Sequence, residues 1–259
     1  MMGRTRLRYG PHRSQRADLW LPDAGQGEGG RPVVVLVHGG FWRSRYTKVL
    51  MTRLARSVCG QGWAAWNVEY RRLGALGGRG GWPSTFLDVA RAVDHLRELD
   101  DVDSDRVVVC GHSAGGLLAL WLAGRGRLAA GAPGAGPLVT VKGAVSLAGV
   151  ADLRRAADLG LGDGAVVALL GGFPADVDAR YAMASPLDLV PFGVPSVLVH
   201  GLDDTTVPAS MSERFVGAAQ RAGDEAVYVP IAGNGHRSMI DPSGEGWAAA
   251  VSHFRRWLA

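Results

Sequence analysis

Apolar positions recur along this chain with two different periods. Short runs rich in valine and leucine are typical of buried strands, and they alternate with longer segments in which apolar residues fall at helical spacing. The short runs predict strands over residues 17–21, 32–37, 63–68, 106–110, 143–147, 194–200 and 225–231. The longer segments predict helices over residues 48–59, 84–99, 117–123, 209–222 and 245–258. Residues 17–21 alternate in polarity, so we expect that strand to be half exposed.

Strands that alternate with helices predict an α/β fold, with a mostly parallel twisted sheet of about eight strands and helices on both faces. The alternation stops between residues 149 and 190, where short helical stretches are separated by glycine turns. We interpret residues 149–190 as a small cap inserted in a single domain that spans residues 1–259. Two smaller features are also expected, namely a loop over residues 25–30 and a helix N-cap at Ser84.

The composition excludes several classes of function. Hydrophobic residues make up 47% of the 259 residues, which is ample for a sizeable core. The net charge of +4 is mild, so we interpret the N-terminal arginines as a solvated arm and not as a nucleic-acid site. No apolar run reaches the ~18 residues of a membrane span, no signal-peptide pattern is present, and the two cysteines form no disulfide framework. We therefore expect a cytoplasmic protein without a nucleic-acid or membrane partner.

The segment Gly111-His-Ser-Ala-Gly115 carries the strongest chemical signal. Its Gly-x-Ser-x-Gly pattern is typical of a nucleophile elbow, a tight turn that lifts a serine hydroxyl into a cleft. With 38 glycines in the chain, the pattern alone could arise by chance. However, the buried strand predicted before it and the apolar helix predicted after it are the setting that an elbow requires. We therefore predict that Ser113 is a nucleophile.

A nucleophilic serine needs a base, and the base needs an orienting acid. In sheets that carry an elbow, the chain order is serine, then acid, then histidine. Of the histidines late in the chain, His253 lies inside the last predicted helix, whereas His236 follows a strand in a glycine-rich loop, so we predict His236 as the base. Asp203 and Asp204 follow the preceding strand. The spacing to residues 207–208 favours Asp204 as the acid, and we expect the other aspartate to cap the following turn.

The same reaction needs amide donors for the developing oxyanion. Adjacent glycines in His38-Gly-Gly-Phe-Trp42, directly after the strand over residues 32–37, allow the backbone to approach a substrate closely. No metal-ligand spacing, Walker loop or dinucleotide fingerprint is present, so we expect neither a metal nor another cofactor. We predict oxyanion-hole amides at Gly40, Phe41 and Ala114, and a substrate pocket lined by Phe41, Trp42, Tyr70 and Trp82.

These motifs resemble the α/β-hydrolase superfamily over essentially the whole chain. The His38–Trp42 segment resembles the turn of kynurenine formamidase-like and related carboxylesterase branches, whereas the hormone-sensitive-lipase branch usually has a third glycine where this chain has Phe41. Residues 69–73, 201–204 and 235–242 also resemble this superfamily. The resemblance implies the α/β-hydrolase fold and a Ser-His-Asp triad, and it specifies the substrate much less.

The sequence therefore predicts a serine hydrolase that cleaves a small carboxylic ester or aryl (form)amide through an acyl-enzyme. Two rival interpretations are a small serine peptidase of the prolyl-oligopeptidase type and a non-catalytic ligand-binding module on a hydrolase fold. The expected partner is a small-molecule ester or amide substrate. A homodimer is compatible with the sequence, which defines no interface.

Overall fold

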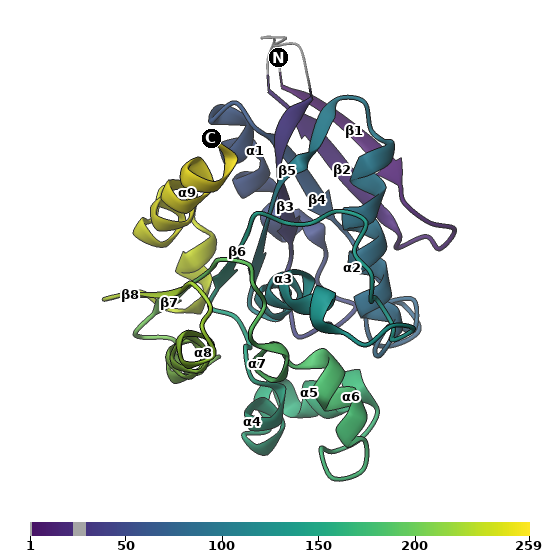
Figure 1. Cartoon of the computed structure of the whole chain (residues 1–259), viewed down its shortest axis with the longest axis vertical. Helices are drawn as coiled ribbons and strands as arrows, with labels where there is room; N and C mark the ends of the chain where they lie inside the picture. Colours follow the sequence, from purple (N-terminus) through teal and green to yellow (C-terminus); the bar gives the residue numbers. More distant parts are fainter. Residues whose placement is uncertain (1, 23–29) are drawn as a thin grey trace.

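The computed structural model describes residues 2–22 and 30–259 (Figure 1). Within these ranges eight strands form one sheet, in the order β1-β2-β4-β3-β5-β6-β7-β8. Strands β1 and β2 are antiparallel to their neighbours, and the other neighbouring pairs are parallel. The expected loop over residues 25–30 lies outside the described ranges, except for residue 30. The strands are β1 (Gly3–Arg8), β2 (Arg16–Leu21), β3 (Arg31–Val37), β4 (Ala64–Val68), β5 (Val102–His112), β6 (Gly143–Leu147), β7 (Ser196–Gly201) and β8 (Ala226–Ile231).

Helices follow most strands, as the alternating pattern predicts. Those outside the β6–β7 connection are α1 (Thr52–Gly60), α2 (Ser84–Asp94), α3 (Ala114–Gly124), α8 (Ser210–Arg221) and α9 (Glu245–Leu258). Four further helices lie between β6 and β7 within the described chain: α4 (Leu153–Asp158), α5 (Leu161–Leu170), α6 (Asp178–Ala184) and α7 (Pro186–Leu189). Short 3-10 turns are η1 (Lys48–Met51), η2 (His95–Glu98), η3 (Arg125–Arg127) and η4 (His236–Ile240).

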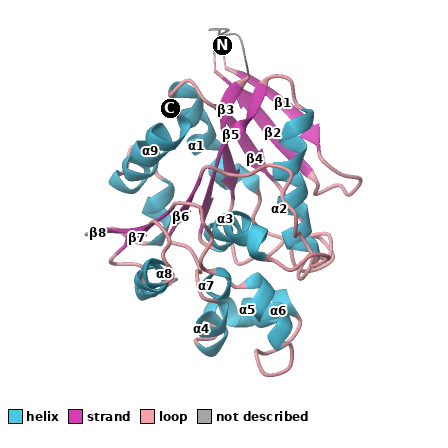
Figure 2. Cartoon of the chain, viewed as in Figure 1, coloured by secondary structure: helices cyan, strands magenta, loops and turns pink. Residues whose placement is uncertain are grey.

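The helices cover both faces of the sheet (Figure 2). Helices α1 and α9 pack on one face, where they form a core cluster with Val34 and Leu36 of β3. Helices α2, α3 and α8 pack on the other face with Val35 and Val37 of the same strand. Because successive side chains of a strand point to opposite faces, the valine-rich run of β3 contributes to both clusters. The mostly parallel sheet predicted from the sequence is therefore confirmed.

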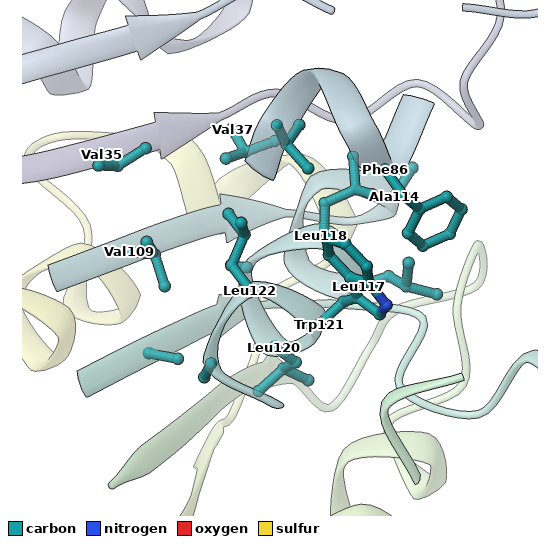
Figure 3. Packing of buried hydrophobic residues seen from close by; sticks show 14 of the residues in the cluster. Val35, Val37, Phe86, Val109, Ala114, Leu117, Leu118, Leu120, Trp121 and Leu122 are labelled. Atoms are coloured by element: carbon teal, nitrogen blue, oxygen red, sulfur yellow. The ribbon is translucent and has the colours of Figure 1, made fainter. Parts of the chain in front are cut away.

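Helix α3 is the central element of the larger cluster. All of its residues are buried, which explains why its sequence is apolar around the whole circumference. Its leucines and Trp121 pack with Val35, Val37 and Val109 of strands β3 and β5 (Figure 3). The end of β5 and the start of α3, which enclose Ser113, are therefore held by the most buried part of the molecule.

The N-terminal arginines are not a solvated arm. Residues 3–8 form β1, an edge strand that pairs with β2, and both Arg4 and Arg6 form ion pairs with Asp18. Strand β2 is buried over residues 17–20, so the expectation of a half-exposed strand is wrong. The reason is that both faces of β2 are covered, and its alternating polar residue, Asp18, is neutralised by Lys48.

One helix boundary also differs from the expectation. Ser84 is the first residue of α2 and not its N-cap, because the cap position is occupied by Pro83, which makes no side-chain bond. The turn is held instead by Thr85, whose hydroxyl accepts the Gly81 amide at 2.9 Å and donates to the Arg71 carbonyl at 2.7 Å.

Residues 149–190 fold into the expected short helices, at the lower end of the molecule in Figure 1. They pack against the main domain, because Leu169 and Tyr181 belong to the same core cluster as α3. The indole of Trp121 in α3 also donates a hydrogen bond to the Met183 carbonyl at 2.9 Å. This segment therefore extends the main core at the end of the sheet where the parallel strands finish.

Candidate active site

Ser113 lies in a strained turn between β5 and α3. Its backbone angles are φ 56° and ψ −121°, a conformation that non-glycine residues rarely adopt. A Cβ atom at Gly111 would lie 1.9 Å from the Gly115 carbonyl oxygen, and one at Gly115 would lie 2.1 Å from the Val37 carbonyl oxygen. Only glycine fits at both positions, so the two flanking glycines of the motif are required by close backbone packing.

The predicted acid and base are in direct contact. Nδ1 of His236 lies 2.6 Å from Oδ2 of Asp204, whose side chain is fully buried. Asp203 is exposed, and the ion pair of His236 is formed with Asp204. We expected one aspartate to orient the histidine and the other to cap the turn, but Asp204 does both. Its other oxygen, Oδ1, accepts hydrogen bonds from the amides of Thr206 and Val207, at 2.8 and 2.9 Å. One carboxylate thus caps the turn and faces the histidine.

His200 is a second partner of this carboxylate that the sequence did not reveal. It is fully buried at the end of β7, with Nε2 3.1 Å from Oδ2 of Asp204 and Nδ1 2.7 Å from the Ser212 hydroxyl. Burial raises the pKa of Asp204, but hydrogen bonds from His200, His236 and the Val207 amide outweigh burial and hold this pKa well below its ordinary value. Asp204 therefore stays ionised at neutral pH.

The Asp204 contact fixes the tautomer of His236. Its Nδ1–H donates to the carboxylate, which leaves Nε2 free to accept a proton. His236 and Ser113 line one cavity of about 190 Å³. The full lining consists of Gly40, Phe41, Tyr46, Leu50, His112, Ser113, Thr206, His236, Arg237 and Ile240. The structure therefore brings the predicted nucleophile and base to one site, with the acid behind the base.

His112, the residue before the serine, connects the elbow to the loop that carries the base. Its Nε2–H donates to the His236 carbonyl oxygen at 3.0 Å, and the two imidazole rings lie 4.7 Å apart. Burial, together with the charge of His236, lowers the pKa of His112 to about 3. His112 is therefore neutral at physiological pH and acts as a hydrogen-bond donor.

The predicted oxyanion turn follows β3 and has an unusual backbone. Gly40, Phe41 and Trp42 have φ angles of 110°, 48° and 54°, so three consecutive residues have positive φ. Gly40 and Phe41 line the same cavity as Ser113. Ala114 is the first residue of α3, where a backbone amide has no partner within its helix. All three predicted amide donors thus belong to residues at or beside the cavity.

Of the four aromatic residues predicted to line the substrate pocket, Phe41 alone belongs to the lining of this cavity. Phe41 lines the cavity, but the side chains of Trp42 and Tyr70 are 0% exposed and belong to the core. Tyr70 stacks on His38 with ring centroids 4.4 Å apart, and Trp82 is a partly buried residue that packs on Phe86. Sequence reasoning missed the walls formed by Tyr46, Leu50, Thr206, Arg237 and Ile240, whose side chains meet only in the folded chain.

The segment predicted as a cap contributes none of the residues that line this cavity, although all of residues 149–190 are described. Gly162 of this segment lies beside Phe41, which lines the cavity. A Cβ atom at Gly162 would lie 2.5 Å from the ring of Phe41, and Arg43 donates to the Gly162 carbonyl at 2.5 Å. The role of residues 149–190 as a cap therefore stays a prediction.

Comparison with known proteins identifies the family of this chain. The model of the BD-FAE family matches residues 17–218, which include the elbow, the oxyanion turn and the acid. The chain belongs to the BD-FAE family. This family assignment confirms the α/β-hydrolase resemblance, whereas the formamidase-like branch stays a prediction.

Two curated relatives of this BD-FAE family member come from Mycobacterium tuberculosis. The chain is 29% identical to "Esterase LipC" over 90% of its length, and 27% identical to "Probable carboxylic ester hydrolase LipM" over 85% of its length. It spans 59% and 52% of those two proteins, which is little more than half of each.

Solved structures confirm the α/β-hydrolase fold. A truncated carbohydrate esterase from gut microbiota is 19% identical with a TM-score of 0.83, and the match covers 98% of this chain and 95% of that one. Thermogutta terrifontis esterase 2 is 21% identical with a TM-score of 0.77, over 99% of this chain and 94% of that one.

Two further properties concern the described residues. No helix there is both long and apolar enough to cross a membrane. No cluster of three or more His, Cys, Asp or Glu side chains in the same ranges is arranged to hold a metal ion. The cytoplasmic location and the homodimer stay predictions.

Proposed function

We propose that this BD-FAE family member is a serine hydrolase that cleaves small carboxylic esters through an acyl-enzyme. The observation that carries the proposal is the 2.6 Å contact between His236 Nδ1 and Asp204, with His236 and Ser113 on one cavity. The two mycobacterial relatives are named as an esterase and a carboxylic ester hydrolase, which favours an ester over the predicted (form)amide.

In the proposed mechanism, Ser113 Oγ attacks the ester carbonyl carbon while its proton passes to Nε2 of His236. The tetrahedral intermediate collapses, and the alcohol leaves with that proton. Water then attacks the acyl-enzyme and loses a proton to His236. The second tetrahedral intermediate collapses, His236 returns that proton to Ser113 Oγ, and the carboxylic acid is released. Asp204 stays ionised throughout and stabilises the imidazolium that forms in both steps.

The proposed oxyanion hole consists of the amides of Gly40, Phe41 and Ala114. Two of these residues precede the serine by about 70 positions in the chain, yet they line the same cavity. Removal of one such donor costs roughly 10²–10³-fold in kcat in other serine hydrolases. The positive φ angles of Gly40 and Phe41 are consistent with backbone that is held for a function and not for regular structure.

The cavity favours a short acyl group. Its volume of about 190 Å³ is below the roughly 300–1,000 Å³ of sites that enclose drug-sized ligands. Phe41, Leu50 and Ile240 supply apolar walls. We therefore expect kcat/KM to fall along a series of p-nitrophenyl esters from acetate to decanoate.

The deciding experiment compares two serine variants. In Ser113→Ala, turnover of p-nitrophenyl acetate is expected to fall by roughly 10⁶-fold in kcat, to the background rate, because the nucleophile is lost. Ser146→Ala is the matched control, because Ser146 is buried on the neighbouring strand opposite Gly111 and its hydroxyl has no hydrogen-bond partner among the described residues. Circular dichroism of both variants checks that they fold.

A fluorophosphonate probe gives an independent readout. It is expected to label the wild-type protein and Ser146→Ala at Ser113, and to leave Ser113→Ala unlabelled. Full turnover in Ser113→Ala would contradict the proposal. A folded wild-type protein that neither reacts with the probe nor hydrolyses any ester of the panel would favour the non-catalytic binding module. Including N-formylkynurenine in the panel tests the predicted (form)amide activity.

A further inference from the structure

A buried set of ionisable side chains lies behind the oxyanion loop, which we define as residues 38–46. Its members are His38, Glu69 and Arg72, with 0%, 1% and 7% of their side chains exposed. Oε1 of Glu69 lies 3.0 Å from Nε2 of His38 and 3.2 Å from Nε of Arg72. None of the three lines the catalytic cavity. Since burial of charged groups is costly even when they are paired, the set calls for a structural or functional reason.

Both ring nitrogens of His38 face hydrogen-bond acceptors. Nε2 faces Glu69, and Nδ1 lies 2.8 Å from the Gly39 carbonyl oxygen. A neutral imidazole has a proton on one nitrogen only, so it can donate one of these bonds, whereas an imidazolium donates both. Burial raises the pKa of Glu69, but the hydrogen bond and charge of His38, with the charge of Arg72 and the Lys48 amide, outweigh it and lower this pKa. An ionised Glu69 thus faces the ring.

The Gly39 contact determines where the neighbouring amide points. In a trans peptide the carbonyl of one residue and the N–H of the next point in opposite directions. Because the Gly39 carbonyl is directed at His38, the Gly40 N–H is directed away from His38. Gly40 lines the catalytic cavity, and its amide is one of the proposed oxyanion donors. Rotation of this one peptide would replace a donor by an acceptor at the site.

The opposite end of the loop is held by Arg72. Its Nη1 donates to the carbonyls of Ser44, at 3.2 Å, and Tyr46. Between the two ends, the Leu73 amide donates to the Trp42 carbonyl at 2.8 Å. The segment around Glu69 therefore contacts the loop at its beginning, its middle and its end.

This support matters because the loop is strained. Phe41 and Trp42 have positive φ angles without being glycine, and such residues persist only where the surroundings impose the conformation. The hydrogen bonds from His38, Arg72 and the Leu73 backbone act on carbonyls of this loop, and thereby oppose its relaxation.

We infer that Glu69 and Arg72 are positioning residues for the oxyanion hole. Glu69 holds His38 as an imidazolium that fixes the Gly39–Gly40 peptide, and Arg72 fixes the far end of the loop at Ser44 and Tyr46. The inference rests on the proposed function, because it assumes that the Gly40 and Phe41 amides bind an oxyanion.

The first test uses two neighbouring arginines. Arg72→Lys keeps the charge but loses the planar guanidinium that spans two carbonyls and Glu69. Arg71→Lys is the matched control, because the guanidinium of Arg71 bonds to Asp88 and to the Ser84 carbonyl. For Arg72→Lys we expect kcat for p-nitrophenyl acetate to fall about 10–100-fold with KM nearly unchanged. This decrease is smaller than the ~10²–10³-fold decrease in kcat that follows removal of an oxyanion-hole donor. Affinity for a trifluoromethyl ketone, which forms an oxyanion on Ser113, should fall in parallel.

The second test observes His38 directly and does not depend on turnover. Nitrogen NMR of histidine-labelled Ser113→Ala at pH 7 is expected to show both ring nitrogens of His38 protonated. The signals of His38 are those that disappear when His38→Asn is added to the same protein. Glu69→Gln keeps the side-chain shape but removes the charge, so one ring nitrogen should lose its proton. In the background with Ser113 intact, the same change should lower kcat more than it changes KM.

The outcomes separate this inference from the proposed function. A folded Arg72→Lys that matches Arg71→Lys in kcat and ketone affinity would overturn the inference, as would a His38 ring with one unprotonated nitrogen. If His38 is an imidazolium that depends on Glu69 while no ester is hydrolysed by the wild-type protein, the proposed function fails and the loop support stands.

Discussion

At the nucleophile elbow, residues 111–115, Ser113 has a φ of 56° and is enclosed by a buried strand, a buried helix and two glycines. In the oxyanion loop, Phe41 and Trp42 have φ angles of 48° and 54°, and their loop is held by His38, Tyr70 and Arg72. The elbow is thus held mainly by close packing against backbone, and the loop mainly by hydrogen bonds from a distant segment.

The difference shows two ways of maintaining strained backbone beside a reactive group. Packing excludes alternative conformations sterically, so it depends on the absence of side-chain atoms at the flanking glycines. Hydrogen bonds from buried charged groups select one peptide orientation, so they depend on each partner being present and correctly protonated. The elbow should therefore be sensitive to added atoms, and the loop to removed ones.

The largest effect is expected from adding one methyl group at the elbow. In Gly115→Ala the new Cβ would lie 2.1 Å from the Val37 carbonyl oxygen, so β3 or α3 must shift, at a cost of about 3 kcal/mol in the free energy of unfolding. Urea unfolding measures the loss, and ester turnover should fall with it. Gly60→Ala is the control, because nothing lies within 4 Å of its new Cβ. Equal stability of the two variants would refute the packing explanation of the elbow.

A smaller effect, dependent on pH, is expected at His112, the polar side chain of the elbow. Burial lowers its pKa to about 3 in the folded protein, whereas an unfolded histidine titrates near 6.5. Between these values the unfolded chain binds a proton that the folded chain does not, so stability falls as pH decreases, by about 1.4 kcal/mol per unit. His112→Gln keeps a donor for the His236 carbonyl but cannot titrate.

The measurement compares urea unfolding of His112→Gln and the wild-type protein between pH 7 and pH 5, a range that avoids most carboxylate titration. The variant should lose less stability than the wild-type protein as the pH decreases. If the free energies of unfolding of the two proteins change with pH in parallel, His112 has an ordinary pKa and water reaches its side chain in the elbow.

The smallest effect is expected from removing one oxygen atom beside the oxyanion loop. The Tyr70 hydroxyl donates to the His38 carbonyl at 2.7 Å, so Tyr70→Phe leaves a buried carbonyl without this donor, at a cost of about 1 kcal/mol. Tyr181→Phe removes a similar bond to the Gly172 carbonyl, away from the active site. We expect both variants to lose similar stability and only Tyr70→Phe to lose kcat. A kcat loss in Tyr181→Phe as well would mean that general destabilisation explains both.

Several features were predictable because their signals are local. The valine-rich strands and the apolar helix α3 follow from hydrophobic pattern, and Ser113, Asp204 and His236 follow from motif and chain order. Strand β1 was missed, although Arg4, Arg6 and Arg8 alternate with period two, because the charge pattern was attributed to a solvated arm.

Other features could not be predicted, because they depend on which side chains meet. Trp42 belongs to the oxyanion turn and Tyr70 follows strand β4, but the side chains of both residues are buried in the core. Composition does not distinguish a core aromatic from a pocket wall. The contact between His200 and Asp204 depends on the fold of the loop after β7, which the sequence pattern does not specify.

The sequence by itself determined the parallel strands of the sheet, the elbow and the order of the three candidate catalytic residues, because hydrophobic pattern and turn sterics involve residues that are close in the chain. The tertiary structure alone decided the walls of the cavity and the partners of Asp204. It also decided the charged support of the oxyanion loop, because His38, Glu69 and Arg72 meet only when β3 and β4 pair side by side in the sheet.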